Sequence, residues 1–257
     1  LLFLPNIKKM TASIDDEMQI DLEKTTDEEN YIIINDNSWN IHRSGTKVLD
    51  DGKSKFKYAI AWKDEMNVEG MFYNYFPTDV PTDLPCIIHA TFDLTNNRKE
   101  INRTVANLFI LDEIVNSLGE IADKRLKNEK ADWQAYQFLT AENNVHREVL
   151  KQFYNNLTKK REEIFVYPTV DNQYLKKEDV VYHGEEFSDW VVINGYGKAF
   201  PRLSLPHQDR FIYLSKRYLP QEIYQAIIAI NKDLTLIQRV KLIGIFAITE
   251  KNNFKEL

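Results

Sequence analysis

Hydrophobic positions divide the chain into a strand-rich first part, a helical middle and a mixed last part. Up to about residue 94, short apolar runs alternate with polar turns, which is typical of β-strands. Strands are expected at residues 2–7, 18–25, 31–35, 55–62, 70–76 and 86–94. Because short turns separate most neighbours, we expect a mixed or mostly antiparallel sheet.

Three prolines interrupt this pattern between residues 76 and 85. Pro77, Pro81 and Pro85 each lack an amide donor, and each favours an extended conformation for the residue before it. We therefore expect a stiff, irregular connector here rather than a helix or an inner strand.

A long amphipathic helix is predicted after the last of these strands. Asn97, followed three residues later by Glu100, matches a capping box, so the helix should run from Arg98 to about Lys127. Its apolar positions recur every three or four residues, at Ile101, Val105, Leu108, Leu111, Val115, Leu118 and Ala122. A sheet with this helix packed across one face is an α+β fold.

The expected helix start carries two cations, Arg98 and Lys99. Cations are disfavoured in a first turn, where amides are unpaired and the helix dipole is positive. Their presence favours a phosphate or carboxylate ligand at this point. The alternative is that both side chains simply solvate the helix end.

Further elements follow along the chain. Helices are expected at residues 131–139 and 145–161, then short strands at 164–167, 180–182 and 190–193, and finally helices at 221–230 and 236–247, the last one capped by Thr235. The change of pattern predicts one domain at residues 1–163 and a smaller mixed α/β domain at residues 164–257.

Composition excludes several classes of function. A formal charge of −6 opposes sequence-independent binding of nucleic acid by the whole chain. No segment has the length of a membrane span, and none of the 5 histidines shows metal-ligand spacing. The single cysteine, Cys86, lies in an apolar run, which predicts an inert core thiol and a reducing, cytoplasmic location.

Three segments resemble the middle, or transducer, region of sacsin-like GHKL ATPases, which is similar to the middle domain of the ninety-kilodalton heat-shock chaperones. They are Leu2-Phe-Leu-Pro-Asn-Ile-Lys-Lys9, Phe92-Asp-Leu-Thr-Asn-Asn-Arg98, and the stretch from Ile164 to Tyr182, in which Asn172 stands where a glycine is usual. The motifs of the ATP-binding half, namely a Glu/Asn helix, Asp-x-Gly-x-Gly and a Gly-rich lid, do not occur in the chain. We therefore expect a fragment whose ATP-binding neighbour lies upstream.

The resemblance implies specific roles. Arg98 would reach the terminal phosphate of ATP held by the upstream domain, Asn97 would orient the loop, and Lys99 and Asn102 would add a second contact. ATP and Mg would belong to the full-length protein, with no cofactor in this fragment alone and no activity of its own. Partners would be the upstream domain of the same chain and, in addition, a second copy or a client protein.

Two other functions remain open. The chain is alternatively a non-catalytic scaffold for protein interaction or dimerisation, built on the long helix and the last region. A weaker alternative is a DNA-linked GHKL machine of the mismatch-repair or topoisomerase type, which salt-sensitive DNA binding would indicate.

Overall fold

The computed structural model describes residues 1–4, 6–14, 18–49, 51–65, 67–128, 134–140, 148–205 and 220–253. The chain forms two compact units, each with its own core. Unit 1 comprises Leu1–Ala122 and Gln137–Lys160, and unit 2 comprises Asp123–Tyr136 and Arg161–Leu257. The predicted α+β class is confirmed.

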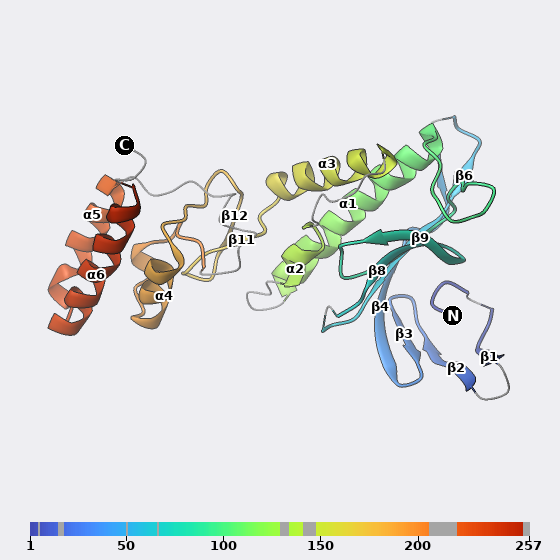
Figure 1. Ribbon diagram of the computed structural model, residues 1–257, viewed down its shortest axis with the longest axis horizontal. Coiled ribbons are helices and arrows are strands. Elements are labelled where there is room, and N and C mark those ends of the chain that lie inside the picture. The colour runs from blue at the N-terminus through green and yellow to red at the C-terminus, as the bar shows by residue number, and fades with distance from the viewer. Residues whose placement is uncertain are drawn as a thin grey trace. The chain divides into compact units, whose positions relative to one another are not determined.

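Unit 1 is built on an eight-stranded mixed sheet (Figure 1). The strands lie in the order β1 (Lys9–Ile14), β2 (Met18–Asp27), β3 (Tyr31–Ile34), β4 (Asn37–Arg43), β7 (Tyr58–Trp62), β10 (Ile87–Ala90), β8 (Gly70–Asn74) and β9 (Phe76–Thr82). Only β10 and β8 pair in parallel, and the other neighbours are antiparallel. A separate hairpin joins β5 (Lys47–Val48) to β6 (Lys55–Phe56).

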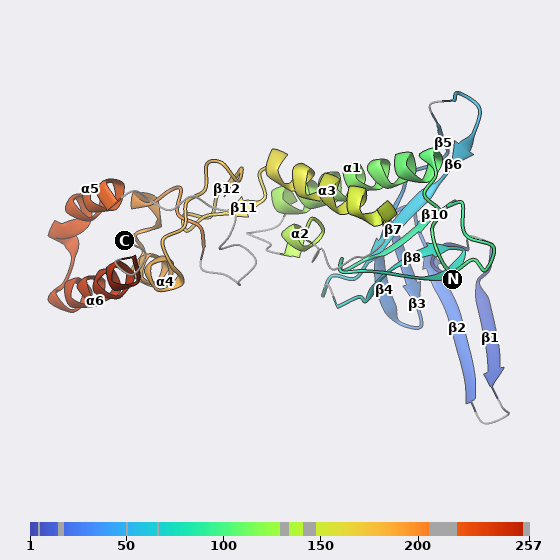
Figure 2. The same ribbon diagram turned by 45° about the horizontal axis from the view of Figure 1, so that its top comes forward.

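Helices α1 (Val105–Asn128) and α3 (Glu148–Glu163) cover one face of this sheet (Figure 2). Aromatic side chains fill the space between the layers. Phe56 meets Phe109 of α1, and Phe72 meets Phe153 of α3, both edge to face with ring centroids 5.8 and 5.7 Å apart. These four rings anchor both helices on the same core.

The opposite face of the sheet carries a second cluster of apolar side chains. Ile32, Ile41, Ala59 and Ala61 are buried there. The first residues, including Phe3, pack against this cluster instead of forming a strand. The predicted strand at residues 2–7 is therefore wrong.

Polar and proline-rich segments account for the other errors in strand placement. Phe76–Thr82 forms the strand β9 and not the expected irregular connector. Because β9 lies at the edge of the sheet, where a strand tolerates Pro77 and Pro81, the expectation that this segment is not an inner strand is confirmed. Strands β1 and β4 were not predicted; the sequence of β4 is largely polar, whereas that of β1 alternates polar and apolar residues.

Unit 2 contains the short sheet of β11 (Tyr167–Pro168) and β12 (Tyr174–Leu175), together with helices α4 (Glu185–Ile193), α5 (Pro220–Ile230) and α6 (Leu236–Asn253). Short 3-10 turns lie at Gly197–Ala199 and Asn231–Asp233. The strand expected at residues 190–193 is wrong, since these residues end α4 and Trp190 packs in the unit 2 core. The Thr235 cap is confirmed: the Gln238 N–H donates to Thr235 Oγ1 at 3.3 Å, and the Thr235 N–H donates to Gln238 Oε1 at 2.8 Å.

Both predicted middle helices are found, the first ending two residues before its predicted end and the second extending two residues beyond it. Helix α2 covers Gln134–Gln137 within the predicted 131–139, and α3 covers Glu148–Glu163 against the predicted 145–161. Residues 131–133 and 145–147 lie outside the described part of the chain.

Candidate functional site

The segment that carries Arg98 is a closed loop between β10 and α1. Leu94 and Ile101 form an antiparallel bridge at its base. Inside the loop, the Thr95 N–H donates to Glu100 O at 2.9 Å and the Arg98 N–H donates to Thr95 O at 2.7 Å. These bonds hold the chain in a tight turn.

The prediction that Asn97 caps a helix beginning at Arg98 is wrong. Asn97 Oδ1 accepts hydrogen bonds from the Lys99 N–H at 3.0 Å and from the Thr95 hydroxyl at 2.6 Å, which closes a local turn. Arg98 has a φ of 59°, which a right-handed helix does not allow. The dipole of a helix therefore does not act on Arg98 or Lys99.

Helix α1 begins seven residues later than predicted. Thr104 is its N-cap, because Thr104 Oγ1 accepts from the Asn107 N–H at 3.2 Å, and the Thr104 carbonyl accepts from the Leu108 N–H at 3.0 Å. The predicted end near Lys127 agrees with the observed end at Asn128.

Arg98 is exposed at the tip of the loop. No hydrogen bond or ion pair of its guanidinium group is found among the described residues. Its left-handed backbone costs about 1 kcal/mol for a residue other than glycine or asparagine. Of the other described non-glycine residues with positive φ, three are Asn or Asp and one is Tyr75.

The other two predicted ligands, Lys99 and Asn102, make contacts within the protein. Lys99 Nζ lies 3.1 Å from Asp79 Oδ2 of β9, and the Lys99 carbonyl accepts from the Asp79 N–H at 2.8 Å. Both side chains are more than half exposed, so the ion pair adds little stability and mainly orients the loop. The Asn102 side chain donates to Leu94 O at 2.9 Å.

Asn107, which the sequence did not indicate, fixes the base of the loop. It is fully buried on α1, and its Oδ1 accepts from the Asp93 N–H at 2.9 Å. Its Nδ2 donates to Asp93 O at 2.7 Å and to Asn102 O at 2.8 Å. The only signal in the sequence was a polar residue inside an apolar helix, beside Val105 and Leu108.

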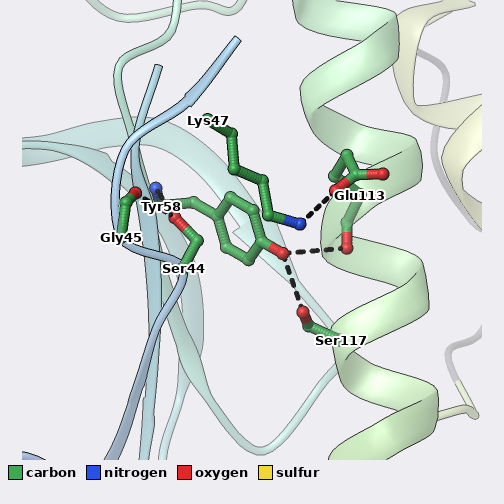
Figure 3. Close-up of polar contacts among 6 residues, drawn as sticks. All are labelled: Ser44, Gly45, Lys47, Tyr58, Glu113 and Ser117. Carbon is green, nitrogen blue, oxygen red and sulfur yellow. Dashed lines mark hydrogen bonds and ion pairs between the residues drawn. The ribbon is translucent and has the colours of Figure 1, made fainter. Parts of the chain in front are cut away.

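A second polar cluster lies between the sheet and α1 (Figure 3). The Tyr58 hydroxyl and Ser117 Oγ are 2.7 Å apart, and the same hydroxyl donates to Glu113 O at 3.3 Å. Ser44 Oγ accepts from the Tyr58 N–H at 2.9 Å, and Lys47 forms an ion pair with Glu113. A cavity of about 340 Å³ adjoins this cluster.

The polar contacts of this cluster have a structural role. The hydrogen bond with Glu113 raises the pKa of Lys47, so its ammonium group stays protonated and does not serve as a base. Tyr58 and Ser117 are both buried and satisfy one another. The cluster therefore attaches β5 and β7 to α1.

Among the described residues, no group of three or more His, Cys, Asp or Glu side chains is placed to hold a metal ion. A search of the helices in the same part of the chain finds none with the length and apolar character needed to cross a membrane. Comparison with protein families, with curated proteins and with solved structures finds no match to this chain.

Proposed function

We propose that this chain is the transducer-type middle domain of a sacsin-like GHKL ATPase and that Arg98 contacts the terminal phosphate of ATP held by an upstream domain. Closure of that domain on the loop brings the phosphate to the guanidinium group, which neutralises charge that develops during phosphoryl transfer. Hydrolysis removes the anchor and lets the two domains separate. The fragment alone then binds neither ATP nor Mg tightly.

The observation that carries the proposal is the state of Arg98. An exposed cation without a partner among the described residues sits on a loop whose backbone is fixed by Thr95, Asn97 and Asn107. The positive φ of Arg98 is a strained backbone conformation, which persists only where surrounding contacts hold it. Such strained residues are concentrated at functional sites. A fixed loop lowers the entropic cost of presenting the side chain.

A second observation concerns the departure from the family motif at Asn172. This residue has a φ of 62°, in the region that usually requires glycine, and its N–H donates to Thr169 O at 2.9 Å. Asparagine tolerates this conformation better than other non-glycine residues. Asn172 therefore keeps the turn that a glycine makes, which removes one argument against the resemblance.

The proposal is tested in the protein that includes the ATP-binding domain. Arg98→Ala is expected to lower kcat about 10³-fold and to change the Kd for ATP by less than about threefold, as removal of a transition-state cation does. Arg103→Ala is the matched control, because Arg103 is also exposed and lies before α1. Equal turnover in the Arg98→Ala protein would remove Arg98 from the mechanism.

One observation favours the alternative of a dimerisation scaffold. Helix α6 exposes a row of large apolar side chains: Leu236 (77%), Ile237 (71%), Val240 (61%) and Ile243 (68%). Together they expose roughly 500 Å², a large part of the about 800 Å² that each partner buries in a standard interface. A second copy of the chain is the partner that this scaffold would take.

Sedimentation velocity tests the scaffold. The scaffold alternative predicts a concentration-dependent dimer that Val240→Asp abolishes. Lys241→Asp, at an exposed polar position beside the apolar row, should leave part of the dimer population intact. A chain that stays monomeric at about 100 μM, well above the Kd of most specific complexes, would contradict it.

A further inference from the structure

A cavity of about 620 Å³ lies in unit 1 on the sheet face opposite to the helices. Its floor contains Ile41 and Ala59, and the N-terminal residues Leu2, Phe3 and Leu4 line its side. Ala59, on the inner strand β7, has a small side chain, and the N-terminal residues Leu2 to Leu4 leave the cavity above it open. The volume lies within the range of sites that bind small molecules.

One wall of this cavity is His89 on β10. The side chain is 7% exposed, and its Nε2 atom is buried without a hydrogen-bond partner. Burial lowers the pKa of His89 to about 4, so the imidazole is neutral at pH 7 and has one N–H to donate. An unpaired buried polar group is costly, and such a group is a reason to expect a ligand atom.

Aromatic rings hold His89 in place. Phe3 stacks on it with ring centroids 4.9 Å apart, and Tyr75 contacts it edge on at 5.0 Å. Tyr75 is 52% exposed, has a φ of 63° and also lines the cavity. Phe3 and Tyr75 therefore flank the imidazole in the cavity lining.

A cation lies on the same face at the mouth of the cavity. Lys57 lines it, is exposed, and has no ion-pair partner among the described residues. His89 pairs with Ala59 across β10 and β7, and Lys57 is two residues from Ala59, on the same face. A diagonal pair of this kind is about 7 Å apart between Cα atoms, which allows one carboxylate to contact both side chains.

We propose that this cavity binds a small amphipathic anion, with an aromatic or aliphatic body over Ile41 and Ala59 and a carboxylate between His89 and Lys57. The apolar floor holds the body by burying it from water. Lys57 supplies the charge and His89 a directed hydrogen bond, so the site selects an anion over a neutral or cationic analogue.

The test uses three probes with the same ring body: 2-naphthoate, 2-naphthol and 2-naphthylmethylammonium, titrated calorimetrically into the 257-residue chain at pH 7. We expect saturable binding of one 2-naphthoate per chain, at least tenfold tighter than 2-naphthol, and no binding of the ammonium compound. Absence of saturable 2-naphthoate binding would overturn the proposal, as would equal affinity for all three probes.

Variants locate the site. Lys57→Gln is expected to weaken 2-naphthoate about tenfold and to leave 2-naphthol unchanged, which is the size expected when one charge-assisted bond is lost. Lys55→Gln is the matched control, since Lys55 is exposed and lies outside the cavity lining. Thr91→Trp, in the lining of the cavity, should block binding of both 2-naphthoate and 2-naphthol, while circular dichroism shows that the fold is kept. Unchanged 2-naphthoate affinity in both Lys57→Gln and Thr91→Trp would refute this location.

Discussion

Asn107 determines whether the Arg98 loop keeps its shape, so its replacement gives the sharpest structural prediction. Asn107→Ala removes three partly buried hydrogen bonds, two to the backbone of Asp93 and one to Asn102 O. At about 1 kcal/mol for each bond, the loss is about 3 kcal/mol. The carbonyls of Asp93 and Asn102 each keep one N–H donor, from Asn102 and Thr104 respectively, at 3.0 Å. For a unit of this size, that loss corresponds to a fall in Tm of about 10 °C.

Urea unfolding measures this loss as a lower midpoint at an unchanged slope. Amide hydrogen exchange of the segment from Asp93 to Asn102 should also become faster, because the loop loses its attachment to α1. Asn116→Ala on the same helix is the control. Asn116 is exposed, so the change in stability should stay within about 0.5 kcal/mol. A loss below about 1 kcal/mol for Asn107→Ala, or an equal loss for Asn116→Ala, would refute the reasoning.

Four further predictions follow from single residues. Burial lowers the pKa of His89 to about 4, so between about pH 6.5 and pH 4 only the unfolded chain takes up the proton. The free energy of unfolding should therefore fall by up to about 3 kcal/mol over this range. Urea titrations of His89→Gln should lack this part of the pH dependence. Arg98→Asn should raise the free energy of unfolding by up to about 1 kcal/mol, since asparagine tolerates a φ of 59°. A lower Tm of the Arg98→Asn protein in thermal melts would contradict the claim that the Arg98 backbone is strained. Cys86 is fully buried and burial raises its pKa, so it should react with a thiol reagent only at the rate of unfolding. Thr235→Ala should destabilise the start of α6 by about 1 kcal/mol, seen as faster hydrogen exchange there.

The periodic parts of the fold were predictable because their pattern follows from burial on one face. Helix α1 is an example, since Leu111, Val115, Leu118 and Ala122 are buried. The start of α6 was predictable from its Thr235 cap instead. The buried position of Cys86 was also confirmed. Local patterns with two physical solutions were not predictable. Asn97 with Glu100 fits a capping box and also a tight turn, and the bridge from Leu94 to Ile101 decides for the turn.

Long-range partners account for the features of the sites that the sequence did not reveal. Nothing in the local sequence of Asn107 indicates that it bonds to Asp93, 14 residues earlier. In the same way, His89 lies within the strand predicted at residues 86–94, but its stacking on Phe3 depends on how the first residues pack against the sheet. Such contacts follow from packing, which periodicity does not encode.

The affinity of the ATP-containing protein for ADP with aluminium fluoride, an analogue of the phosphoryl-transfer transition state, tests most directly whether Arg98 stabilises that state. We predict that Arg98→Ala weakens this complex at least about 100-fold while ATP binds as before, because the guanidinium contact strengthens only as charge develops. An Arg98→Ala protein that binds the analogue as tightly as the unmodified protein would contradict the account.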